Sequence, residues 1–87
     1  MTPGEFYERV LAYCSWSRAS VTSGLRSPER NAAVHGHERS MHLVGLAADV
    51  VYHPNPVPGI DTAKHFASRL GLLLVRESDH DHIQVPY

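Results

Sequence analysis

Apolar residues recur at two different spacings along the chain. Near the N-terminus, Phe6, Val10 and Tyr13 repeat at the spacing of one helix face, and Thr2-Pro3 supplies an N-cap residue followed by proline, so a helix is predicted to about residue 17. A short helix is predicted over residues 28–36, and a third from a cap at Asp61 to about residue 70, ended by Gly71.

Short apolar or β-branched runs predict four strands, over residues 19–26, 46–52, 72–76 and 82–85. The segment 53–59 has three prolines in seven residues and fits neither regular element, and residues 77–81 form an acidic turn. This order of elements predicts one small α+β domain spanning residues 1–87, with helices packed on one face of a mostly antiparallel sheet.

Length and composition limit how the fold can be stabilised and which classes of function are possible. A chain of 87 residues gains little more from apolar burial than it loses in conformational entropy, and its single cysteine, Cys14, cannot form an intrachain disulfide. A bound metal or an oligomer interface is therefore expected to stabilise it.

A net charge of −1 without a basic cluster argues against a nucleic-acid surface. The sequence contains no apolar run long enough for a membrane helix and no recognisable signal peptide, so we expect synthesis in the cytoplasm.

The chain has seven histidines but only one lysine, and because histidine is a common metal ligand, this composition favours metal chemistry. Asp49 lies within an apolar strand, with His42 seven residues upstream, and it is either a water-facing carboxylate of an edge strand or a metal ligand. The run Asp79-His80-Asp81-His82 is either a solvated turn or a second ligand cluster, with His80 and His82 on one face of a strand.

Two imidazoles and one carboxylate, leaving one position open for water, are typical of catalytic zinc, whereas structural zinc sites are usually closed and rich in cysteine. Arg26 is either a surface charge or a group that binds a substrate carboxylate or carbonyl. Cys14 is expected in the core. The other four histidines, which have no matched partner, are expected to be ordinary surface or hydrogen-bonded residues: His35, His37, His53 and His65.

The chain contains the motif S-x-H-x-x-G-x-A-x-D over residues 40–49 and, further along, the motif D-H-x-H over residues 79–82. In this order the two motifs resemble those of the M15 family of zinc D-Ala-D-Ala carboxypeptidases and related peptidoglycan peptidases. The resemblance implies that His42, Asp49 and His82 bind one Zn²⁺ ion and that Asp79 is the general base. It further implies that His80 lies near the oxyanion, and that Arg26 and Ser40 contact substrate.

The resemblance implies hydrolysis of peptide bonds in peptidoglycan stem peptides, by a D-Ala-D-Ala carboxypeptidase or an L-Ala-D-Glu-type endopeptidase. The small size favours a phage or prophage endolysin that reaches the cell wall after release. An alternative is a catalytically inactive, zinc-stabilised domain that binds the cell wall. Asp79 and Arg26 favour the enzyme, because a structural zinc site requires neither. A metal-free fold with incidental histidines is a third hypothesis.

Overall fold

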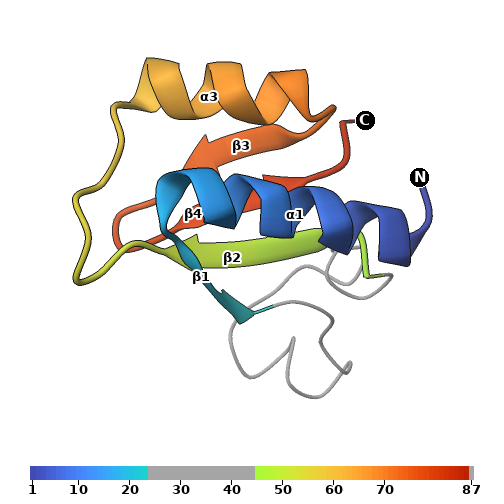
Figure 1. Ribbon diagram of the computed structural model, residues 1–87, viewed down its shortest axis with the longest axis horizontal. Helices are drawn as coiled ribbons and strands as arrows, with labels where there is room; N and C mark the ends of the chain where they lie inside the picture. The colour runs from blue at the N-terminus through green and yellow to red at the C-terminus, as the bar shows by residue number, and fades with distance from the viewer. Residues whose placement is uncertain (24–44, 87) are drawn as a thin grey trace.

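The computed structural model describes residues 1–23 and 45–86. In order, the elements in these residues are helix α1 (Pro3–Ser17), strands β1 (Ser20–Ser23) and β2 (Ala47–Val51), helix α3 (Ile60–Arg69), and strands β3 (Leu73–Arg76) and β4 (Asp81–Gln84). The strands form one antiparallel sheet in the order β1-β2-β4-β3. Both described helices lie over the same face of this sheet (Figure 1). The predicted α+β arrangement is therefore confirmed for this part of the chain.

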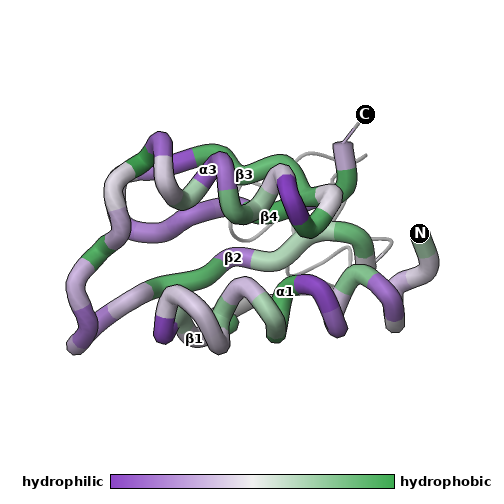
Figure 2. The backbone as a smooth tube through the Cα atoms, turned by 45° about the horizontal axis from the view of Figure 1, so that its top comes forward, coloured by the Kyte–Doolittle hydropathy of each residue, from purple (hydrophilic) through white to green (hydrophobic). Residues whose placement is uncertain are grey.

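The core lies between the sheet and the two described helices. Figure 2 shows hydrophilic and hydrophobic colours alternating along α1 and α3, as expected of helices with one buried face. Val50 on β2, Leu74 on β3 and Ile83 on β4 contribute strand side chains to this core. The helices contribute five buried residues: Phe6, Val10, Tyr13, Ala63 and Ala67. No helix in the described part of the chain is long and apolar enough to cross a bilayer.

The start of α1 follows the sequence prediction closely. Thr2 is the N-cap and Pro3 the first helical residue, as expected. The Thr2 hydroxyl accepts a hydrogen bond from the Glu5 backbone N–H at 3.2 Å, and the Glu5 carboxylate accepts one from the Thr2 N–H at 3.1 Å. This reciprocal capping box satisfies two backbone donors that would otherwise lack partners at the helix start.

Replacing Thr2 by alanine is expected to lower the free energy of unfolding by about 1 kcal/mol, because the Glu5 N–H loses its acceptor. Urea unfolding measures this change. Thr2→Ser, which keeps the hydroxyl, is the matched control and should unfold close to the wild-type midpoint. Equal stability of the alanine variant and the wild type would mean that the cap does not contribute.

The second described helix begins earlier than its sequence predicts. Asp61 was expected to cap it, but α3 begins at Ile60 with Gly59 as the N-cap, so the predicted cap is wrong. Asp61 instead lies in the first turn, where its negative charge is favoured by the helix dipole. Ile60 packs against the core, which explains the earlier start. Gly71 ends this helical segment with a φ of 73°, as predicted.

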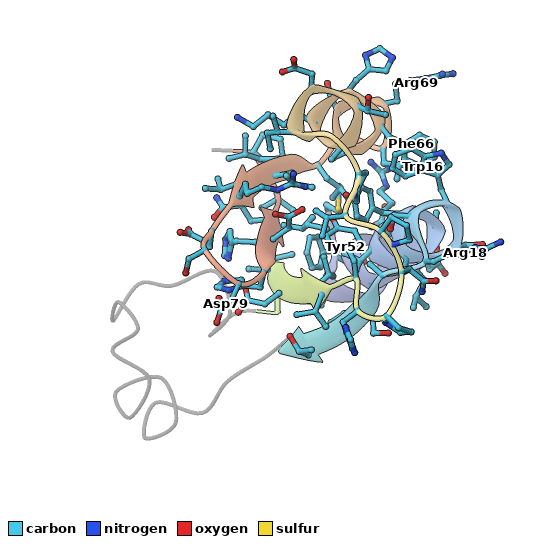
Figure 3. The ribbon with its side chains drawn as sticks, turned by 90° about the vertical axis from the view of Figure 1, so that its left-hand side faces the viewer. Trp16, Arg18, Tyr52, Phe66, Arg69 and Asp79 are labelled. Atoms are coloured by element: carbon cyan, nitrogen blue, oxygen red, sulfur yellow. The ribbon has the colours of Figure 1, made fainter. Side chains whose placement is uncertain are left out.

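Contacts between α1 and α3 join the two helices above the sheet. The rings of Trp16 and Phe66 stack with centroids 4.3 Å apart and an interplanar angle of 9°, and Figure 3 shows the two side chains together between the helices. Cys14, predicted in the core, is half-buried and packs against the core residues. Burial raises the pKa of its thiol.

Candidate metal centre and active site

The pairing of β2 with β4 brings residues from two distant motifs together. Asp49 lies directly opposite His82 in the register of this strand pair. Ala48 and Val50, the neighbours of Asp49, belong to the core beneath the helices. Since successive strand residues point to opposite faces, Asp49 projects from the face of the sheet away from the helices. His82 projects from that face for the same reason, because its neighbour Ile83 is a core residue.

The Asp49 carboxylate is the centre of this group. Its Oδ1 atom lies 3.1 Å from Nδ1 of His82 and 3.7 Å from Nε2 of His80. The side chains are largely but not fully covered, with 18% of Asp49 and 20% of His82 exposed. The hydrogen bond with Asp49 raises the pKa of His82 above its ordinary value, against the opposing effect of burial. His80 lies in the turn before β4, so the prediction that it shares a strand face with His82 is wrong, but both imidazoles still approach the same oxygen atom of Asp49.

Asp79 lies at the solvent edge of the same group. It is 84% exposed, and Figure 3 shows it on the side of the molecule away from the helices. Its Oδ1 atom lies 2.6 Å from Nδ1 of His80, and this hydrogen bond lowers the pKa of Asp79. The His80 imidazole therefore stands between two carboxylates, with Nδ1 toward Asp79 and Nε2 toward Asp49.

Asp81 belongs to a buried network on the opposite face of β4, a network that the sequence alone did not reveal. Only 1% of its side chain is exposed. Arg76 donates to it from Nε and from Nη2, both at 2.8 Å, and the Tyr52 hydroxyl donates to Oδ2 at 2.6 Å. Tyr52 in turn lies 2.6 Å from the hydroxyl of Tyr13 on α1. Figure 3 shows Tyr52 between the sheet and the helices.

The hydrogen bonds of this network keep Asp81 ionised and Tyr52 protonated. Burial raises the pKa of Asp81, but the hydrogen bonds from Arg76 and Tyr52 outweigh burial, and the pKa lies below its usual value. Burial raises the pKa of Tyr52, and its hydrogen bond to Asp81 raises it further, so its hydroxyl remains a donor. Asp81 is therefore an ionised structural residue, distinct in role from its neighbours His80 and His82.

A cleft of about 410 Å³ adjoins Asp79 and His80. Its lining includes the apolar residues Val51 and Val57 and the turn residues Glu77 and Ser78. The cleft thus combines an apolar wall with the carboxylate that is predicted to act as a base.

The donor atoms suit a zinc ion, although the described residues do not complete a site. Within residues 1–23 and 45–86, no three His, Cys, Asp or Glu side chains are grouped so as to hold a metal ion. Two ligands of tetrahedral zinc at about 2.1 Å stand about 3.4 Å apart, close to the separation of the facing Asp49 and His82 atoms. The third predicted ligand, His42, lies outside the described residues, as do Arg26 and Ser40.

Of the remaining histidines, His53 and His65 are exposed, as expected from the sequence, and His35 and His37 lie outside the described residues. Comparison with known proteins adds one finding. A model of the family described as Peptidase M15 matches residues 8–84 of the chain. A search of curated proteins and a search of solved structures found no match.

Proposed function

The chain belongs to the Peptidase M15 family, and from that premise we propose that it is a zinc-dependent peptidase acting on the stem peptides of peptidoglycan. The observation that carries the proposal is the approach of Asp49 to His82. These residues are 33 positions apart in sequence, yet an oxygen of one lies 3.1 Å from a nitrogen of the other. Both are ligand types that zinc prefers, and both come from the motifs that resemble the family.

His42, Asp49 and His82 are the proposed zinc ligands. When bound, the ion would lower the pKa of a coordinated water molecule toward neutrality and polarise the carbonyl of the scissile bond. Three protein ligands leave a position open for that water, which distinguishes a catalytic site from a closed structural one. Cys14 is not part of this set, because it packs against the core beneath the helices.

Asp79 is the proposed general base. As an exposed aspartate, it is ionised at neutral pH and can accept a proton. It would take a proton from the attacking water and later return it to the leaving amine. His80 holds Asp79 through Nδ1, which fixes the direction in which the carboxylate faces, and it is also the proposed auxiliary group near the oxyanion.

Arg26 and Ser40 are the proposed substrate-binding residues. A guanidinium can bind a substrate carboxylate with two parallel hydrogen bonds, or polarise a carbonyl. The cleft beside Asp79 is the proposed location of the peptide next to the cleaved bond. The bond is either D-Ala-D-Ala, as in a carboxypeptidase, or an L-Ala-D-Glu-type bond, as in an endopeptidase. Action on the cell wall as an endolysin is part of the same proposal.

Removal of the metal tests this function directly. Purified peptidoglycan is digested with the wild-type chain, with the chain treated with a chelator, and with the treated chain to which Zn²⁺ has been restored. We expect new amines and shortened stem peptides by mass spectrometry in the first and third digests only. The masses also identify the bond. Bound zinc without cleavage would favour the zinc-stabilised binding domain, and absence of bound zinc would overturn the proposal.

A further inference from the structure

The Gln84 side chain contacts the edge of the His82 imidazole that faces away from Asp49. The two residues are separated by one position on β4, so their side chains lie on the same face of the sheet. Oε1 of Gln84 lies 2.7 Å from Nε2 of His82, and the Gln84 side chain is buried, with 6% of the residue exposed. The opposite ring nitrogen, Nδ1, faces the Asp49 carboxylate at 3.1 Å. Gln84 and Asp49 therefore contact the two nitrogens of one ring.

The orientation of the Gln84 amide is fixed by a second contact. Its Nε2 atom lies 3.3 Å from the backbone carbonyl oxygen of Val85. Because a carbonyl oxygen only accepts hydrogen bonds, the amide nitrogen must be on that side, and Oε1 must face the imidazole. Oε1 is also only an acceptor, so the hydrogen between it and His82 belongs to Nε2 of the ring.

A neutral imidazole with hydrogen on Nε2 has its lone pair on Nδ1. That lone pair points toward the carboxylate of Asp49 at 3.1 Å, so a zinc ion bound there would replace the proton that Nδ1 shares with Asp49 in the metal-free chain. We propose that Gln84 is a positioning residue that holds His82 in the Nε2–H tautomer and aims Nδ1 at the metal ion. This inference rests on the proposed zinc site. Outer hydrogen bonds of this kind typically contribute 10- to 100-fold to metal affinity.

Zinc affinity tests the inference without reference to catalysis. The affinity of the full chain for Zn²⁺ is measured by competition with a chromophoric chelator, for the wild type and for Gln84→Met and Gln84→Glu. Methionine has a similar length but lacks the acceptor oxygen, and we expect its affinity to fall by about 10- to 100-fold. Glutamate retains an acceptor oxygen, and we expect an affinity near that of the wild type.

The outcomes separate this inference from the proposed function. If the wild type binds no zinc, both fail. If it binds zinc and Gln84→Met binds equally well, only the role of Gln84 is overturned. Nitrogen-15 NMR of the His82 ring in the zinc-loaded wild type gives a readout that depends on no variant. We expect a protonated Nε2 and a metal-bound Nδ1. The reverse assignment would overturn the inference even if Gln84→Met did not fold.

Discussion

Replacing Arg76 by methionine is expected to lower the free energy of unfolding by about 3 kcal/mol. The substitution leaves the carboxylate of Asp81 buried without its cation, since only 1% of the Asp81 side chain is exposed. Breaking one side of a buried ion pair typically costs about 3–5 kcal/mol. The lower end of that range applies because 29% of the Arg76 side chain is exposed, so part of the lost interaction is already screened by water.

Urea unfolding of the metal-free chain measures this loss, and a double substitution identifies its cause. Arg76→Met with Asp81→Leu removes both charges, so no unpaired carboxylate remains in the core. Tyr52 still has the Tyr13 hydroxyl as a partner. The double variant should therefore be more stable than Arg76→Met alone. If the two substitutions were simply additive, the loss would come from packing rather than from the stranded charge.

The sequence predicted the described helices and strands, but it failed at a boundary that depends on tertiary contacts. The N-terminus of α1 was predictable because Thr2, Pro3 and Glu5 interact within a single turn. The start of α3 was not, because Gly59 makes no side-chain cap and Ile60 is held by its packing against the core. A cap residue such as Asp61 is a local preference that tertiary packing overrides.

The same distinction applies to the candidate site. The motif around Asp49 and the motif around His82 could be matched from sequence, and the register of β2 against β4 brings the two residues together. The role of Asp81 required the fold. Its alternation with His82 was visible in the sequence, since Asp81 and Ile83 share one strand face and Ile83 is apolar. Its partners Arg76 and Tyr52 were not identifiable, because the hydrogen bonds depend on how strands and helices pack.

Replacing Asp79 by asparagine is expected to lower kcat on peptidoglycan by about 100- to 10,000-fold, the usual contribution of a general base. Asparagine has nearly the same shape but cannot take a proton from water at neutral pH. Zinc affinity should remain within a few-fold of the wild type, because Asp79 is not a proposed ligand. The unfolding midpoint should not change either, because the Asp79 side chain is 84% exposed and lies in a turn.

Glu77→Gln is the matched control for this substitution. Glu77 is an exposed carboxylate in the same turn, and it lines the same cleft as Asp79. This substitution removes one negative charge from the cleft, as Asp79→Asn does. It leaves the proton acceptor adjacent to His80 in place. We expect Glu77→Gln to retain activity within a few-fold of the wild type. Equal losses in the two variants would assign the effect to cleft charge, and an active, zinc-loaded Asp79→Asn chain would remove Asp79 from the role of base.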